Sequence, residues 1–376
     1  MPSVFLGDFP EPDRVEGAPH PRETVRLVGH EAAQESFLSS FRAGRLHHGW
    51  LITGPRGVGK ATLAWRLARF LLAVPEDDGG MFAPPPPETL DIPDDHPVAR
   101  RLVALSEPGL YLLRRGLNLT ETMPAQEILV GEVRRLKDYF ALSAADGGRR
   151  VAIIDSADEM NMQAANALLK LLEEPPAGVV FLLISHQPSR LLPTIRSRCR
   201  ELRLVPLPAE QMAQALEQAG TPAEDPQAMA ELAGGSVGAA IRLANLDGMA
   251  FYEDLLAVLS GLPRMDRAKL LALSESGSGK GREQHFDLAV TLIDLLLARL
   301  ARSGTTGVLP LEAGRGEAAL LQRLSPDPWA ARRWAELAQS LSARARRGKA
   351  VNLDPAALLM DMLLQIEQTA ATLAAR

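Results

Sequence analysis

A glycine-rich segment between an apolar run and a helical pattern constrains the fold of this chain more than any other feature. Trp50–Thr53 is apolar and strand-like, Gly54-Pro-Arg-Gly-Val-Gly-Lys60 follows it, and Ala61–Leu72 has helical periodicity. This is the context of a Walker A loop, in which glycines turn backbone N–H groups around phosphate and a lysine reaches the terminal phosphates. The segment therefore predicts an α/β fold with a phosphate-binding loop. The candidate nucleotide contacts are Gly54, Gly57, Gly59 and Lys60.

The position after the lysine departs from this motif. A Walker A loop carries Ser or Thr there to hold Mg²⁺, whereas this chain has Ala61. Thr62 is a further candidate contact, but it lies one residue late and about 100° around the helix, so it is a poor substitute. Two interpretations stay open. Either the loop binds ATP or ADP, with Mg²⁺ accompanying the nucleotide, or it is a retained scaffold that binds nucleotide weakly or not at all.

A second element for handling phosphate should be a strand that ends in acids. Arg149-Arg-Val-Ala-Ile-Ile-Asp155 predicts such a strand, and Asp155 at its end is a candidate for binding a Mg²⁺-bound water. A hydrolysing enzyme of this type normally has Glu next, to polarise the attacking water, but here the residue is Ser156. We expect Asp158 and Glu159 to cap the following helix. Because both the metal-binding hydroxyl and the base are missing, the sequence predicts that this chain alone does not hydrolyse ATP efficiently.

Apolar runs and helical patterns alternate along the first half of the chain. Strand-like runs recur at 110–113, 151–154, 179–184 and 201–204, and apolar residues have helical spacing at 130–140 and 164–172. This alternation predicts a mainly parallel sheet covered by helices on both faces. Beyond Pro206 the pattern is helical throughout. The predicted divisions are an extended arm at 1–23, a P-loop domain at 24–205, a small helical domain at 206–250 and a helical C-terminal domain at 251–376.

The negative charge of the chain is concentrated in one segment. The whole chain has a net charge of −5, but residues 75–99 contain seven acids and no Lys or Arg, so the remainder has a net charge of +2. The same segment contains a run of prolines, 84–87, and we expect it to be a surface insertion or linker that contributes nothing to a core. A remainder so close to neutral does not indicate a strong independent DNA binder.

Three further motifs make the pattern more specific. Asn166-Ala-Leu-Leu-Lys-Leu-Leu-Glu-Glu-Pro-Pro176 is a helix with an apolar stripe, Val179–Ile184 is a buried strand, and Ile195-Arg-Ser-Arg-Cys199 is a turn that presents Arg198. Together with Leu27-Val-Gly-His30, they resemble the clamp-loader branch of the AAA+ ATPases over nearly the whole chain. The resemblance implies an α/β AAA+ P-loop domain, a helical lid domain and a helical collar domain for oligomerisation.

The departures from that family indicate the kind of subunit. Its motor subunits, gamma and tau in bacteria, carry Ser or Thr after the Walker lysine, Asp-Glu at the end of the second strand, and Arg in a lid stretch Gly-Ser-x-Arg. Here those positions hold Ala61, Ser156 and Gly238, whereas Ser197-Arg198-Cys199 persists. This pattern resembles the delta-prime family of bacterial DNA polymerase III subunits, whose members serve as stators and contribute an arginine finger to a neighbouring motor subunit.

The resemblance implies a role and a set of partners. Arg198 would act in trans as the arginine finger, and a surface ion pair is the alternative for this residue. The partners would be gamma/tau-like motor subunits and a delta-like subunit, with the sliding clamp and primed DNA reached through the complex. The chain would support ATP-dependent clamp loading within the DNA polymerase III holoenzyme. The alternatives are an autonomous P-loop ATPase, a motor subunit, and an AAA+-derived adaptor outside replication.

The number of cysteines bears on zinc binding, and the apolar runs bear on the cellular compartment of the protein. Clamp-loader subunits often carry a four-Cys zinc module after the Walker A helix, but Cys199 is the single cysteine here, so we expect no zinc. We expect Cys199 to be a small buried side chain. No apolar stretch reaches membrane-spanning length and the N-terminus lacks a signal-peptide pattern, so we expect a cytoplasmic protein without a membrane partner.

Basic side chains offer candidate DNA contacts without singling one out. The candidates are Arg134, Arg135, Lys137, Arg149 and Arg150, with an ordinary solvated face as the alternative for each. The denser run at 344–349 lies in the predicted collar, so we expect it at an interface or a free surface. We expect His47, His48 and Trp50 to be structural.

Overall fold

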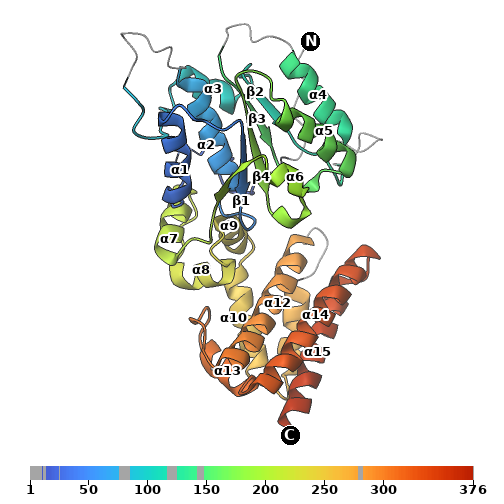
Figure 1. Ribbon diagram of the computed structural model, residues 1–376. Coiled ribbons are helices and arrows are strands. Elements are labelled where there is room, and N and C mark those ends of the chain that lie inside the picture. Colours follow the sequence, from blue (N-terminus) through green and yellow to red (C-terminus); the bar gives the residue numbers. More distant parts are fainter. Residues whose placement is uncertain are drawn as a thin grey trace. The chain divides into compact units, whose positions relative to one another are not determined.

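The computed structural model describes residues 11, 14–24, 26–75, 85–116, 125–141, 148–277 and 283–375. Most of the predicted arm at 1–23 and residues 76–84 of the acidic segment lie outside these ranges. The chain divides into two compact units. The first is Met1–Leu207 with Gln218–Gly220 and Ser236–Gly238, and the second is Pro208–Glu217, Thr221–Gly235 and Ala239–Arg376 (Figure 1). The further division of the helical region into a lid and a collar stays a prediction.

Five strands form the sheet of the first unit. They are β1 (Gly49–Thr53), β2 (Leu110–Leu113), β3 (Arg150–Ile154), β4 (Val179–Ser185) and β5 (Arg200–Arg203), in the order β2-β3-β4-β1-β5. All four neighbouring pairs are parallel, so the carboxyl ends of the strands meet at one edge of the sheet. Each strand-like run predicted from the sequence is confirmed to within one residue at either end.

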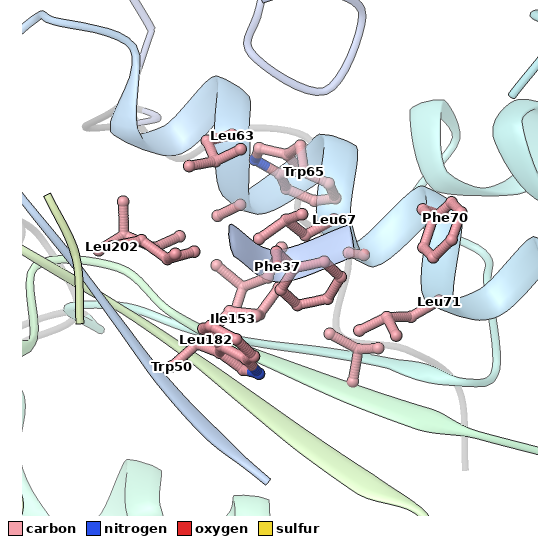
Figure 2. Close-up of a cluster of buried hydrophobic side chains, with 14 of the residues drawn as sticks. Phe37, Trp50, Leu63, Trp65, Leu67, Phe70, Leu71, Ile153, Leu182 and Leu202 are labelled. Atoms are coloured by element: carbon pink, nitrogen blue, oxygen red, sulfur yellow. The ribbon is translucent and has the colours of Figure 1, made fainter. Parts of the chain in front are cut away.

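Helices cover both faces of this sheet, as the alternation predicted. On one face, α1 (Glu31–Arg42), α2 (Lys60–Ala73) and α3 (Pro97–Val103) pack against alternate strand residues that include Trp50 and Ile153. Figure 2 shows Leu63 and Leu67 of α2 above these side chains. On the other face, α4 (Val130–Ala141), α5 (Met162–Glu173) and α6 (Pro193–Arg196) pack against the intervening strand residues. The expected α/β fold class is therefore confirmed.

The acidic segment departs from its prediction, because its described part contributes to the core. Leu90 and Val98 are buried in the same apolar cluster as Phe37, and Ile92 packs against that cluster. The Nε of Arg42 donates to the carbonyl of Pro87 at 2.7 Å. The expectation that this segment contributes nothing to a core was wrong for residues 85–99. Its many acids and prolines concealed a few apolar side chains that are spaced to reach α1 and α2.

Beyond β5, every regular element that the structure describes is a helix, as predicted. These helices are α7 (Ala209–Gln218), α8 (Pro226–Ala233), α9 (Val237–Asn245), α10 (Gly248–Leu259), α11 (Arg267–Ser276), α12 (Glu283–Thr306), α13 (Glu317–Leu324), α14 (Pro328–Ala350) and α15 (Pro355–Ala374). Aspartates followed by proline begin three of them, at Asp225, Asp327 and Asp354, where the carboxylate accepts a hydrogen bond from a backbone N–H of the first turn. In the described part of the chain, no helix combines the length and the apolar character needed to cross a bilayer.

Candidate functional site

The loop between β1 and α2 has the backbone geometry that its glycines predict. Gly54, Gly57 and Gly59 have φ values of 143°, 74° and 107°, which L side chains rarely adopt. A Cβ on Gly54 would lie 2.5 Å from the carbonyl oxygen of Leu204. Gly59 is the N-cap of α2, and because glycine has no side chain, the N–H groups in the first turn of this helix have no side-chain cap. The residues present therefore fit a phosphate group through backbone N–H groups at a helix N-terminus.

Lys60 lies within its own loop. Its Nζ donates to the carbonyls of Gly54 at 2.7 Å and Pro55 at 2.5 Å, and the residue is 3% exposed. Burial lowers the pKa of Lys60 to about 8, an effect that the nearby Asp158 opposes. Ala61 and Thr62 follow in the first turn of α2, both half-buried. The lysine is thus held by loop carbonyls, and the side chain after it offers no ligand to Mg²⁺.

Asp155 lies where the sequence predicts, directly after β3. It is 7% exposed, and its backbone N–H donates to the carbonyl of Leu113 at 2.8 Å. Its carboxylate is close enough to Lys60 to influence the pKa of that amine. Asp155 and the β1 loop therefore meet at the carboxyl edge of the sheet, where Asp155 would face a Mg²⁺ ion that accompanies a nucleotide. In the described residues, these included, no group of three or more His, Cys, Asp or Glu side chains has an arrangement that could hold a metal ion.

Asp158 was wrongly predicted to cap the helix that follows. The side chain of Asn161 caps α5 instead, accepting from the N–H of Ala164 at 2.9 Å. The buried Asp158 carboxylate accepts from the backbone N–H groups of His186 at 3.0 Å and Gln187 at 3.2 Å. A short 3-10 helix, η1 (Ala157–Glu159), intervenes before α5 and turns this acid toward the end of β4. Asp158 therefore ties the residues after β3 to those after β4.

Glu159 was also predicted to cap α5, and that prediction was wrong as well. Its carboxylate forms ion pairs with Arg56 of the glycine loop at 3.2 Å and with Arg115 at 2.9 Å. Glu159 is the last residue of η1, and its carboxylate lies with these two arginines and not at the first turn of α5. Glu159 thus links the residues after β3 to the β1 loop.

His186 also belongs to this site, although no sequence motif pointed to it. We call the glycine loop 54–59, together with Lys60, Asp155, Ser156, Asp158, Glu159 and His186, the phosphate corner. It directly follows β4, and its Nε2 lies 3.3 Å from the hydroxyl oxygen of Ser156, the residue that stands in place of a catalytic base. Burial lowers the pKa of His186 to about 4, and the positive charge of Lys60 adds to this effect. Its Nδ1 is buried and has no hydrogen-bond partner among the described residues. Its position at the end of a strand next to β1 is the sequence signal that points to it.

The segment Leu27–His30 contacts the glycine loop, as its motif implied. The Nε2 of His30 lies 2.9 Å from the carbonyl oxygen of Val58. A Cβ on Gly59 would lie 2.9 Å from the Cδ1 of Leu27, so this leucine packs directly against the N-cap of α2. This segment therefore covers the loop at the start of α2.

The segment Ser236–Gly238, at the start of α9, lies against the opposite part of the loop, within the same compact unit. The hydroxyl of Ser236 donates to the carbonyl of Arg56 at 2.8 Å, and the N–H of Gly238 donates to the carbonyl of Gly57 at 3.0 Å. A Cβ on Gly238 would lie 3.1 Å from the Cα of Gly57. At the position where the resemblance places a lid arginine, two glycine backbones are therefore in close contact.

Arg198 lies at the other edge of the sheet, in the turn between α6 and β5. Its carbonyl oxygen would lie 3.2 Å from a Cβ on Gly49, the first residue of β1, whereas the glycine loop follows the last residue of that strand. From Trp50 to Thr53 the strand advances about 10 Å. Arg198 is therefore separated from the loop of its own chain by the length of β1.

The guanidinium of Arg198 is engaged within the chain. Its Nη2 lies 2.9 Å from a carboxylate oxygen of Glu173, and its Nη1 donates to the carbonyl of Thr194 at 3.1 Å. The surface ion pair that was the alternative for Arg198 is therefore present. Cys199 beside it is half-buried, and burial raises the pKa of its thiol to about 12.

The other candidates occupy ordinary structural or surface positions. Trp50 is fully buried, and the Nε2 of His48 lies 2.9 Å from the carbonyl oxygen of Leu172, in keeping with structural roles. Arg134 and Lys137 are exposed on α4, whereas the Arg149 guanidinium lies 4.8 Å from the centre of the Phe41 ring. In the basic run at 344–349, Arg344 pairs with Asp361 at 2.8 Å and Lys349 with Asp287 at 2.6 Å. These contacts single out no DNA-binding residue.

Comparison with known proteins finds similarity to subunits of DNA polymerase III. A family model described as DNA polymerase III, delta subunit, matches residues 29–208. The chain is 30% identical over 343 residues to DNA polymerase III subunit delta' of Escherichia coli, covering 89% of this chain and 92% of that relative. It is 35% identical over 237 residues to DNA polymerase III subunit delta' of Pseudomonas aeruginosa, covering 61% and 65%. It is also 34% identical over 197 residues to DNA polymerase III subunit tau of Salmonella typhimurium, covering 52% and 28%.

Proposed function

Because this chain belongs to the delta-prime family of DNA polymerase III subunits, we propose that it is the stator of a clamp loader. In this role it assembles with gamma/tau-like motor subunits and a delta-like subunit in the cytoplasm. It supports ATP-dependent loading of the sliding clamp on primed DNA, and it reaches clamp and DNA through the complex. Its own P-loop does not carry out the hydrolysis.

The observation that carries this proposal is that the phosphate corner has the backbone and side chains that would bind phosphate but lacks the groups that hydrolyse it. The glycine loop, Lys60 and Asp155 are in place, but Ala61 offers no hydroxyl to Mg²⁺. Ser156 stands where a base would polarise water, and its hydroxyl lies beside His186. Phosphoryl transfer depends on both missing groups. A nucleotide bound here would be held by loop N–H groups and Lys60 without being hydrolysed.

The second part of the proposal concerns Arg198. Its distance from the loop of its own chain supports a role in trans, at the nucleotide site of a neighbouring subunit. The side chain is 38% exposed and keeps a permanent positive charge, which suits it to neutralise charge that develops on a γ-phosphate. We therefore assign Arg198 as the arginine finger of this subunit.

Hydrolysis by the purified chain alone tests the proposal against an autonomous ATPase or a motor subunit. We expect no hydrolysis above background at saturating ATP and Mg²⁺. A motor-like rate that Lys60→Ala abolishes would overturn the stator assignment. Co-purification with sliding clamp and polymerase subunits tests the adaptor alternative. We expect these proteins to co-purify with the chain, whereas an adaptor outside replication would not bind them.

Arg198→Ala in the reconstituted complex tests the arginine finger. Because fingers of this kind accelerate phosphoryl transfer by orders of magnitude, we expect DNA-stimulated hydrolysis to fall by about tenfold or more, with assembly intact. Arg196→Ala is the matched control, since it removes an exposed arginine two positions earlier. Equal rates for Arg198→Ala and wild type would remove the assignment.

A further inference from the structure

The side chain of Arg198 contacts the ends of two helices that pack on the same face of the sheet. Glu173 is the last residue of α5, and Thr194, whose carbonyl also accepts from Arg198, lies in α6. Both ends of the ion pair remain open to solvent, with side-chain exposures of 38% for Arg198 and 42% for Glu173. The guanidinium is therefore held at the surface of the protein, not buried beneath it.

The position of Glu173 is well determined by its helix. The apolar stripe of α5, which includes Leu168, Leu171 and Leu172, is buried against the sheet, and prolines at 175 and 176 end the helix just beyond Glu173. A helix C-terminus carries partial negative charge, which adds to the attraction of the carboxylate for a cation. The end of α5 is thus a fixed acceptor site for the Arg198 side chain.

A carboxylate and a phosphate compete for the same face of a guanidinium. Both accept from guanidinium N–H groups, so while the Nη2 of Arg198 is paired with Glu173 that nitrogen is withheld from a γ-phosphate. Exposed ion pairs contribute little net stability, because water and salt compensate most of their attraction. The contact with Glu173 is therefore strong enough to bias Arg198 and weak enough to be broken by a better acceptor.

We propose that Glu173 is a positioning residue that holds Arg198 in a resting arrangement and releases it when a neighbouring subunit presents its nucleotide. The inference rests on the proposed function, in which Arg198 is an arginine finger. Glu173 acts only through Arg198 and touches no nucleotide itself. It thereby lowers hydrolysis by the complex in the absence of DNA, when the neighbouring site is not fully assembled around Arg198.

The test is Glu173→Gln in the reconstituted complex, with ATP hydrolysis measured over a range of ATP concentrations. The amide keeps the size of the side chain and removes its charge. Without DNA we expect kcat to rise about two- to fivefold with KM for ATP unchanged, the ratio that corresponds to an exposed ion pair. With clamp and primed DNA the rise should be smaller, because Arg198 is already released. Glu174→Gln removes the same charge one residue later and should leave both rates unchanged.

The double variant Glu173→Gln/Arg198→Ala shows whether the effect passes through Arg198. Its rate should equal that of Arg198→Ala alone. An unchanged or lowered resting rate for Glu173→Gln, or an increase that persists without Arg198, overturns the inference while the finger assignment stands. If Arg198→Ala itself has no effect, the finger assignment fails and the inference fails with it. The two failures are therefore distinguishable in one set of complexes.

Discussion

Lys60 and Arg198 lie at opposite edges of the same parallel sheet, and the chain surrounds them differently. Lys60 is 3% exposed and donates to two carbonyls of its own loop. Arg198 is 38% exposed and is held by one carboxylate and one carbonyl at the surface. A cation bound and buried by its own backbone contributes to the fold. One at the surface with a weak partner is available to another molecule.

The same contrast extends to the residues around each cation. At the carboxyl edge, the loop carbonyls of Arg56 and Gly57 accept from Ser236 and Gly238, and Asp158 binds the backbone after β4. At the amino edge, the contacts of the Arg198 side chain are an exposed ion pair with Glu173 and a hydrogen bond to the Thr194 carbonyl. The phosphate corner is thus an internally bonded junction between strands, whereas the arginine turn presents an exposed ion pair at the surface.

Gly54→Ala should give the largest loss of stability. A small loss would contradict the view that the glycine loop is a constrained part of the fold. The substitution forces an L residue into φ 143° and brings a Cβ within 2.5 Å of the Leu204 carbonyl oxygen. We expect a loss of about 3 kcal/mol in the free energy of unfolding, from backbone strain and overpacking together. Urea unfolding of the isolated chain measures it.

Gly131→Ala is the control for that substitution. Gly131 lies in α4, and a Cβ there would meet no atom within 4 Å. Alanine favours a helix over glycine, so we expect a gain of about 0.5–1 kcal/mol instead of a loss. If both variants lose stability equally, the phosphate corner is no more constrained than an ordinary surface helix.

His186→Gln should give a smaller effect that depends on pH. The folded chain keeps the pKa of His186 near 4, while in the unfolded chain the ring has its ordinary pKa of about 6.5. Between these values the unfolded state binds the extra proton, so the wild type loses stability as pH falls from 6.5 to 4. The variant lacks this contribution. Because the ring is partly exposed, we expect the wild type to lose only about 1–2 kcal/mol more than the variant over this range.

Thermal unfolding at several values between pH 7 and pH 4 measures that difference. Curves that stay parallel for the two proteins would show that His186 is not held neutral by the corner. Burial at the carboxyl edge would then not distinguish this histidine from one in contact with water, and that part of the comparison would fail.

Lys60→Met should give the smallest effect on the complex. It removes the amine and keeps an apolar stem of similar length, so the loop retains its glycine geometry. If the loop serves the fold, we expect DNA-stimulated hydrolysis by the reconstituted complex to stay within about twofold of wild type, a change near the noise of mutational kinetics. A loss as large as that expected for Arg198→Ala would erase the functional difference between the two edges.

Part of this arrangement could be predicted from local pattern. The five strands were recognisable because buried parallel strands are short apolar runs bounded by turn residues. The predicted caps at Asp158 and Glu159 were wrong, because a residue count along the chain did not reveal the η1 turn before α5. The acidic segment was misjudged because composition conceals single apolar residues such as Leu90, which become buried only when a partner surface exists.

The sequence by itself determined which chemical groups this protein has and lacks. The glycine loop, the alanine at position 61 and the serine at position 156 are properties of short segments, because a motif depends on the side chain at each local position. Only the tertiary structure decided which of these groups meet. Asp158 with the backbone after β4, Ser156 with His186, and Glu173 with Arg198 are contacts between residues far apart in the chain. They exist because parallel strands bring their ends to common edges, which no local pattern specifies.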